Sequence, residues 1–380
     1  MLDSNRWVVV GLDSGGTTIN ATVLDSAGSF LVSEMAESPS CVREGPDGAI
    51  EALAGALADV LELTGCPRES VRAVGLDTPG PVTADGVICS KGATNFSAPQ
   101  WRGFDVRGAL EQRLAIPVVF NNDANAAALY AHHKHFGPEL ADQRSSVSVI
   151  VGTGLGGGVV ESGQVIRGAA GMAGELGHIW LPMEGLLAAG QPVPACNCGL
   201  PGDAESVASL TAIEKHLLPY WLTQFPAHEL ASVPVSVAAK QVRAYGEKGD
   251  PLALKIFEQQ AIAIGRLLTI AANFTDPHLY LLGGGVVEAE PQFRDWFLEQ
   301  VRAHTQLREE QARASAIALV PDLDMAGARG SAIAARAAVL SAIGVGLSRA
   351  AGHSEAGLRS EPGMPEAGSR IPVRSRISGQ

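Results

Sequence analysis

Runs of β-branched apolar residues around glycine-rich turns occur twice along the chain. The first copy spans Trp7 to Val32 and the second spans Ser146 to Gly168. In each copy, an apolar run enters a Gly/Ser/Thr turn, leaves as a second strand, turns again at a small polar step and begins a third strand. Two such similar meanders predict two related half-domains.

The rest of the hydrophobic pattern alternates between helical and strand periodicity. Asp250-Pro251 begins the longest helix of the region 204–274, as an N-cap followed by proline at the first helical position. In chain order, the pattern predicts a helix near 50–61, a strand at 71–77, a rigid turn at 78–81, a helix at 106–114, a strand at 116–120, a helix from Ala124, helices across 204–274, strands at 278–282 and 317–320, and an alanine-rich helix at 326–340. This alternation favours an α/β fold.

The two glycine turns are candidates for phosphate binding. Glycine lets backbone N–H groups approach phosphate closely, and Thr17, Thr18 and Thr153 add hydroxyl donors. A single copy would be explained by tight-turn chemistry alone, but the duplication favours a nucleotide held between two lobes. The second copy also contains G-x-G-x-x-G from Gly152 to Gly157, but these glycines lead into another strand and not into a helix. A dinucleotide-binding fold is therefore disfavoured.

Composition narrows the class of protein. The 380 residues, 46% of them hydrophobic, are enough for a sizeable core and two domains. A net charge of −12 without a Lys/Arg cluster argues against a nucleic-acid-binding surface. Neither a membrane-spanning apolar run nor a signal peptide is recognisable, so we expect a cytoplasmic protein without a membrane partner. From about Ala351 the composition loses periodicity, and the tail 351–380 is predicted to be disordered.

Asn122-Asp123 follows a predicted buried strand and precedes a helix. In α/β proteins, functional groups gather at the carboxyl ends of strands. Asp123 or Asn125 could simply cap the helix, and this role is compatible with a chemical one. A carboxylate at a helix N-terminus stays ionised and can accept the proton of a hydroxyl that attacks phosphorus. Phosphoryl transfer needs little else besides positioning and charge neutralisation.

A possible metal site follows the second glycine meander. Cys196 and Cys198 form a C-x-C-G turn that can direct both thiolates at one ion, with His178 and Asp203 as further zinc ligands. Two incidental thiols in a loop are the alternative. Glu175 and His178, three residues apart, could enter a polar site or could be solvated surface residues. The other cysteines, Cys41, Cys66 and Cys89, are scattered and suit reduced thiols.

The motifs together carry a resemblance to a known family. In order they are DSGGT at 13–17, DTPGP at 77–81, NNDANAAAL at 121–129, VGTGLGGGVV at 151–160, GAAGMAGELGH at 168–178, CNCGLPGDAE at 196–205 and LLGGGVV at 281–287. This series resembles the ROK family of repressors, open reading frames and sugar kinases, within the actin-like/hexokinase ATPase superfamily, over residues 7 to about 343. The resemblance implies an α/β, duplicated ribonuclease H-like fold of two lobes with a cleft between them. We expect one lobe from 1–121 plus about 326–345 and the other from 122–325.

The resemblance also implies roles for matching residues. Asp13, Gly15, Gly16 and Thr17 would form the first phosphate loop, with Asp13 near Mg²⁺; Gly152, Thr153, Gly154 and Gly156 would form the second, and Gly283 and Gly284 would lie under the adenosine of ATP. Asn122, Asp123, Glu175, His178 and Glu205 match the sugar-hydroxyl ligands, with Asp123 as the base. His178, Cys196 and Cys198 match three of four structural zinc ligands. A homodimer is expected from the family.

Two features depart from the family pattern. Asp203 stands at the position of the third cysteine of the zinc loop; a carboxylate can ligate zinc, in a harder and weaker ligand set, or the site is lost. The gap from His178 to Cys196 is also longer than usual, so Met183 to Pro194 resembles an inserted loop beside the sugar site. Both features bear on the substrate more than on the reaction type.

Three functions are compatible with these residues. An ATP-dependent sugar kinase is favoured, with glucose as the first candidate because it is the commonest acceptor among relatives. An N-acylhexosamine (N-acetylmannosamine or N-acetylglucosamine), fructose, allose or a cyclitol-like polyol are alternatives. A sugar-sensing repressor is disfavoured because only twelve residues precede Asp13, too few for a helix-turn-helix domain. A non-catalytic sugar-binding regulator is disfavoured because Asp123 and both phosphate turns are present.

Overall fold

The structure, a computed structural model, describes residues 7–34, 36–80, 82–88, 96, 98–320 and 325–352. The described residues up to Val339 form one compact unit. Pro81 of the predicted rigid turn, Cys89 and residues 353–380 of the predicted tail lie outside the described residues, so those predictions are not tested.

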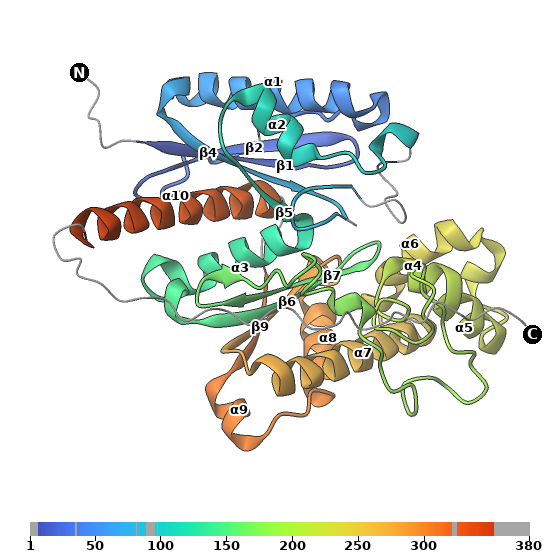
Figure 1. The fold of residues 1–380 in the computed structure, drawn as a ribbon. Coiled ribbons are helices and arrows are strands. Elements are labelled where there is room, and N and C mark those ends of the chain that lie inside the picture. The colour runs from blue at the N-terminus through green and yellow to red at the C-terminus, as the bar shows by residue number, and fades with distance from the viewer. Residues whose placement is uncertain are drawn as a thin grey trace, which may run out of the picture. The chain divides into compact units, whose positions relative to one another are not determined.

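Two five-stranded sheets of identical topology form the framework (Figure 1). In spatial order the first sheet contains β3 (Ala36–Pro39), β2 (Thr18–Asp25), β1 (Val8–Ser14), β4 (Val71–Thr78) and β5 (Val118–Asn122). The second contains, in the equivalent order, β8 (Gln164–Val165), β7 (Leu155–Glu161), β6 (Ser145–Val151), β9 (Leu279–Gly284) and β10 (Ala316–Leu319). In both sheets the first three strands of the chain are antiparallel and the last two join in parallel. The predicted duplication is thus confirmed.

Helices cover the faces of both sheets. They are α1 (Pro46–Thr64), α2 (Val106–Leu114), α3 (Asp123–Leu140), α4 (Leu210–Ala212), α5 (Leu218–Gln224), α6 (Val235–Gly246), α7 (Pro251–Thr275), α8 (Pro291–Ala303), α9 (Glu309–Ala314) and α10 (Ala326–Gly352). Figure 1 shows α1 and α2 on one face of the first sheet and α10 on its other face, with α3 between α10 and the second sheet. Helices α7 and α8 lie beyond the second sheet, where α7 contributes to its core.

Glycine allows α10 to pack directly on the first sheet. A Cβ atom at Gly11 of β1 would lie 1.9 Å from the Ala328 carbonyl oxygen, and one at Gly75 of β4 would lie 1.9 Å from that of Ser331. Val9, Ala73 and Ala332 fill the same interface. The side of β1 and β4 that carries these residues is therefore closed by α10, and the alternate side packs against α1 in a separate core.

Several predicted boundaries move by one or two residues. The strand predicted at 116–120 runs from Val118 to Asn122, since Pro117 lacks the N–H needed inside the ladder, and the following helix begins at Asp123. Helix α3 contains Gly137 with φ of 71°, followed by Pro138, which marks a kink. Helix α10 continues to Gly352, beyond the predicted end at 340 and into the first two residues of the predicted tail.

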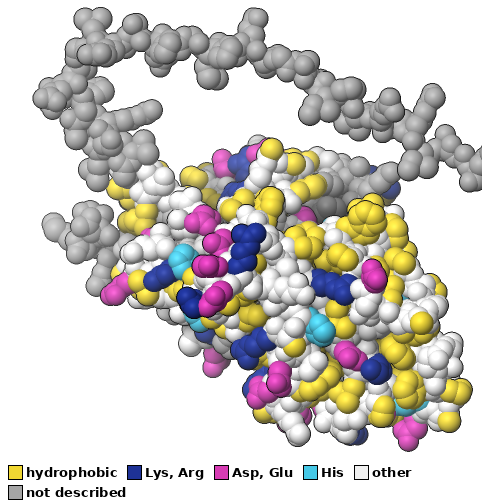
Figure 2. Space-filling view, turned by 90° about the horizontal axis from the view of Figure 1, so that it is seen from below, with side chains coloured by type: hydrophobic (Ala, Val, Ile, Leu, Met, Phe, Trp, Pro, Cys, Tyr) yellow, Lys and Arg dark blue, Asp and Glu magenta, His cyan; other side chains and the backbone are white. Residues whose placement is uncertain are grey.

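The surface gives two further observations. On the face shown in Figure 2, basic and acidic side chains are interspersed and no extended basic patch is visible. None of the helices within the described residues has the length and apolar character needed to cross a membrane.

Candidate active site

The first glycine turn connects β1 to β2 and is open to ligands. The Gly15 N–H donates to the Thr18 carbonyl oxygen at 2.8 Å, and the Thr17 carbonyl oxygen accepts from Ser40 at 3.0 Å. Gly15 and Gly16 are half-buried and Thr17 is exposed. Asp13, at the end of β1, has a half-buried carboxylate that accepts a 3.5 Å hydrogen bond from the Asn20 amide. Burial raises the pKa of Asp13.

The second glycine turn connects β6 to β7 and is held in place by hydrogen bonds on one side. The carbonyl oxygens of Gly152 and Thr153 accept N–H bonds from Leu210 and Thr211 at 2.9 and 3.1 Å, which ties the turn to the start of α4. The outward side of Gly152 and Thr153 is exposed. Gly156 lies one strand residue further on, where a Cβ would come within 3.1 Å of Ala124. The packing of β7 on α3 thus explains why this position is glycine.

A cavity of about 330 Å³ adjoins the second turn. Its wall is largely apolar and is formed mainly by Gly152, Thr153, Leu210, Ile213, Phe257 and Val286. Gly283 and Gly284 end β9 next to this wall, which itself includes Gly285. Gly284 has φ of 98°, and a Cβ there would lie 1.9 Å from the Val151 carbonyl oxygen. A planar base with a sugar would fit such a cavity, with its phosphates toward Thr153.

Asn122 and Asp123 have different roles at the start of α3. The Asn122 side chain caps the helix by accepting the Asn125 N–H at 2.8 Å. Capping by Asp123 or Asn125, the alternative considered from the sequence, is therefore wrong. The Asp123 carboxylate accepts the adjacent Ala124 N–H at 2.7 Å, and part of it faces solvent. Burial among the surrounding protein atoms, with the nearby charges of Asp13 and Glu175, raises the pKa of Asp123 to about 6.

The other predicted sugar ligands gather beside Asp123. The Asn122 amide donates to Glu175 at 3.4 Å, and Glu175 is close enough to raise the pKa of Asp123. Burial in turn raises the pKa of Glu175, which lies near both His178 and Glu205. The Glu205 carboxylate is held by the Leu155 N–H at 2.9 Å. It packs against Gly154, where a Cβ would lie 2.4 Å from Glu205 Oε2. The second phosphate turn and the candidate acceptor site are therefore in direct contact.

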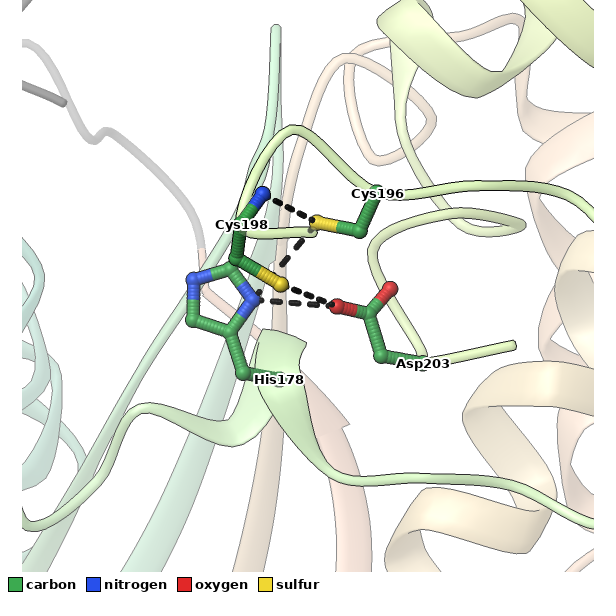
Figure 3. Close-up of side chains that lie close together, drawn as sticks. All are labelled: His178, Cys196, Cys198 and Asp203. Carbon is green, nitrogen blue, oxygen red and sulfur yellow. Dashed lines mark hydrogen bonds and ion pairs between the residues drawn. The ribbon is translucent and has the colours of Figure 1, made fainter. Parts of the chain in front are cut away.

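The four predicted metal ligands converge in a loop next to these residues (Figure 3). Their ligand atoms all lie within 4.8 Å of one another. The separations are 3.1 Å from His178 Nδ1 to Asp203 Oδ2, 3.7 Å from Cys196 Sγ to His178 Nδ1 and 3.4 Å from Cys198 Sγ to Asp203 Oδ2. A tetrahedral zinc ion at its usual bond lengths holds its donors roughly 3.3–3.8 Å apart. The donor set and its spacing thus fit zinc, with Asp203 in the fourth position.

Electrostatics favour the ligand form of Asp203. Its side chain is fully buried, and although burial acts to raise its pKa, the hydrogen bonds from His178 and Cys196 lower it overall. The Ser206 N–H holds the other carboxylate oxygen at 2.8 Å. The long loop before Cys196 is anchored on α7, where Gln259 donates to Gln191 at 2.6 Å.

A further acidic residue, which sequence reasoning did not place in the site, lies beside it. Asp77, at the end of β4, is fully buried beside Asp13 and acts on the pKa of Asp13, while the charges of Asp13 and Asp123 raise the pKa of Asp77. The sequence signal that could have indicated Asp77 is an acidic residue at the end of a buried apolar strand.

Comparison with known proteins identifies relatives over most of the chain. The ROK family profile matches residues 9–338. A glucokinase of Halalkalibacterium halodurans is 33% identical over 305 residues, which cover 79% of this chain and 86% of that protein. An N-acetyl-D-glucosamine kinase of Escherichia coli O127:H6 is 30% identical over 283 residues, which cover 73% and 83%.

Solved structures agree with the sequence relatives. A ROK hexokinase from Thermus thermophilus superposes with a TM-score of 0.70 at 33% identity, covering 88% of this chain and 99% of that one. A ROK family glucokinase from Streptomyces griseus, in complex with glucose and AMPPNP, superposes with a TM-score of 0.60 at 29% identity, covering 87% and 99%. These matches confirm the predicted duplicated α/β fold.

Proposed function

The chain belongs to the ROK family, and on that premise we propose that it is an ATP-dependent kinase that phosphorylates a sugar hydroxyl. The observation that carries the proposal is the position of the Asp123 carboxylate at a helix N-terminus, beside Glu175. Asn122 caps this helix, so the Asp123 carboxylate is not used as the cap. Both glycine turns are present on the same two sheets that frame this carboxylate.

ATP would bind across the two turns. The phosphates would be held by N–H groups of Gly16 and Thr17 on one side and of Thr153 and Gly154 on the other, while Gly15 and Gly152 close the turns through their own N–H bonds. The adenosine would lie in the cavity of about 330 Å³. Gly156, Gly283 and Gly284 would shape the backbone around it. Asp13 suits Mg²⁺, since its carboxylate is half-buried at the end of β1, next to the first phosphate turn, and hard cations prefer carboxylate oxygens. When bound, Mg²⁺ supplies neutralisation of the phosphate charge.

The acceptor would bind through hydroxyl groups. Asn122, Glu175, His178 and Glu205 supply amide, carboxylate and imidazole groups that can orient a sugar, and Asp123 would take the proton of the attacking hydroxyl. Because Asp123 must be ionised for this step, its environment has to tolerate the charge when substrate is bound.

Glucose is the proposed acceptor, with phosphorylation giving glucose 6-phosphate. The similarity to glucokinases supports it, and the similarity to N-acetyl-D-glucosamine kinases favours an N-acylhexosamine as the second candidate. N-acetylmannosamine, fructose and other polyols stay open as further acceptors. A coupled ADP-release screen over hexoses, N-acylhexosamines and cyclitols, ranked by kcat/KM, tests this order.

Asp123→Asn tests the proposed chemistry. We expect the variant to keep sugar binding in calorimetry and to lose turnover by several orders of magnitude. Asp59→Asn, on the exposed side of α1, makes the same chemical change away from the site and should behave as wild type. Turnover of Asp123→Asn close to wild type would refute the role of the base. Sugar binding without ADP release from any acceptor would favour a non-catalytic regulator.

A structural zinc ion is proposed for His178, Cys196, Cys198 and Asp203, which would fix the loop that carries His178 and Glu205. Metal analysis of the purified protein should give close to one equivalent of zinc, and chelation should lower the melting temperature. Cys198→Ser should weaken metal binding. A metal content far below one equivalent, with stability unchanged by chelators, would contradict the site. A homodimer, a cytoplasmic location and lobe boundaries near 121, 325 and 345 stay predictions.

A further inference from the structure

Four polar side chains form a continuous row across the first sheet. Asn20 of β2 pairs with Asp13 of β1, Asp13 pairs with Asp77 of β4, and Asp77 pairs with Asn121 of β5. Directly paired residues on neighbouring strands project to the same face of a sheet. That face is the one closed by α10, because a Cβ at Gly327 of α10 would lie 2.7 Å from the Asp13 carboxylate.

The fold itself does not require this row. The second sheet has the same topology, and the residues equivalent to Asn20, Asp13 and Asp77 are Gly156, Ile150 and Gly283, which are paired in the same way. A sheet of this topology therefore forms with apolar and small residues at these three positions. The polar row has to be explained by something particular to the first half of the molecule.

Asp77 is the least expected member of the row. Its side chain is fully buried, and one carboxylate oxygen, Oδ2, accepts a 2.8 Å hydrogen bond from the Ser331 hydroxyl of α10. The other oxygen, Oδ1, has no hydrogen-bond partner among the described residues, and neither has the buried Asn121 amide nitrogen on the adjacent strand. Leaving a buried carboxylate oxygen unpaired is costly, so such an atom usually indicates a missing water, ion or ligand.

Anchoring of α10 does not explain a carboxylate here. One hydrogen bond from Ser331 could be accepted equally well by the oxygen of an asparagine. A carboxylate instead places a second acidic group directly beside Asp13 and away from water. This arrangement is unfavourable in the absence of a cation and becomes favourable when a cation is bound.

We propose that Asp77 is a second carboxylate of the magnesium site, whose free oxygen Oδ1 holds the Mg²⁺ of Mg²⁺·ATP together with Asp13, directly or through one water molecule. Mg²⁺ bound with nucleotide phosphates is usually held by one or two protein carboxylates, and here they come from neighbouring parallel strands that end at the same edge. The inference rests on the proposed function, since that proposal assigns Mg²⁺ to Asp13.

The test is the Mg²⁺ dependence of AMPPNP binding, measured by calorimetry without acceptor, together with binding of Mn²⁺ followed by the EPR signal of the free ion. We expect Asp77→Asn to raise the metal concentration for half-maximal AMPPNP binding by about tenfold or more. The KM for the acceptor should change little. Ser331→Ala removes the hydrogen bond but keeps the carboxylate, and should shift the metal dependence much less. Asp59→Asn controls for net charge.

The outcomes separate this inference from the proposed function. If wild type binds Mg²⁺·AMPPNP and Asp13→Asn weakens the metal dependence, but Asp77→Asn stays within about twofold of wild type, Asp77 is not a metal carboxylate. A lower melting temperature in Asp77→Asn with unchanged metal affinity would show a purely structural role and would equally overturn the proposal. If Asp77→Asn does not fold, Asp77→Ser takes its place under the same criteria. Failure of wild type to bind Mg²⁺·AMPPNP at all would refute the proposed function instead.

Discussion

The pH dependence of catalysis should report the environment of Asp123. As a base, Asp123 is active only when ionised, and burial, assisted by Asp13 and Glu175, raises its pKa to about 6. Activity should therefore be constant above neutral pH and fall as pH decreases through about 6. At pH 5 roughly one molecule in ten would be ionised, whereas a carboxyl group at the ordinary value of 3.8 would be more than about nine-tenths ionised.

The assay is kcat/KM for the acceptor between pH 5 and 8.5 at subsaturating Mg²⁺·ATP, so that the apparent pKa belongs to the enzyme without substrates. Glu175→Gln provides the internal comparison. Removing this negative charge should move the break in the profile to lower pH, even though the variant binds sugar more weakly. Ionisation of the nucleotide is the same for both proteins and cancels in the comparison.

Three results would refute this reasoning. A wild-type profile that stays flat down to pH 5 would mean that Asp123 has an ordinary pKa or that another step limits the rate. A break that is identical in wild type and Glu175→Gln would show that Glu175 does not act on the titrating group. A break that moves to higher pH would reverse the sign of the predicted interaction.

Three further predictions concern packing and buried groups. Gly154→Ala should lower kcat/KM for the acceptor about tenfold or more. The new Cβ would lie 2.4 Å from Glu205 Oε2 and break the hydrogen bond from the Leu155 N–H to Glu205. Unchanged kinetics would contradict this prediction. Gly75→Ala should destabilise the protein by roughly 1–3 kcal/mol in urea unfolding, because its Cβ would clash with the Ser331 carbonyl oxygen. Gly55→Ala, at an exposed position of α1 with open space around it, should instead stabilise the protein. His132 is fully buried and its pKa is lowered to about 4, so stability should decline by up to about 1.4 kcal/mol per pH unit below 6.5, and this slope should be smaller in His132→Asn.

Features encoded by neighbouring residues were predictable from the sequence. The two meanders, the glycine turns and the Asp250 cap, which accepts the Ala253 N–H at 2.9 Å, depend on residues close together in the chain. Boundaries were less accurate because they depend on which carbonyls and amides find partners in the folded sheet. Asn121-Asn122 joins β5 through pairing with Asp77 and Thr78, and this pairing cannot be read from the local sequence.

The candidate site was predictable where a local motif or the family pattern indicated its residues. The convergence of His178, Cys196, Cys198 and Asp203 was expected from motifs, and the structure adds that all four donors fit one ion. That Asn122 caps the helix while the Asp123 carboxylate does not was not expected from the sequence, because capping depends on the backbone geometry at the junction of β5 and α3. The contact of Gly154 with Glu205 joins loops that are distant in sequence and likewise had no local signal.

Because the two sheets have the same topology, their equivalent positions can be compared directly, and the comparison shows how the two halves differ. Equivalent positions at the strand ends carry Asn20, Asp13 and Asp77 in the first sheet, whereas the second sheet has glycine at two of the three. Gly284, the residue after one of these glycines, lies against the Val151 carbonyl oxygen beside the apolar cavity. That cavity is lined by residues that follow these strands, such as Gly152, Thr153 and Gly285, and not by the three equivalent positions themselves. On the proposals made above, the two halves would serve different ligands on one framework, a cation at the polar row of the first sheet and a nucleoside in the cavity beside the second.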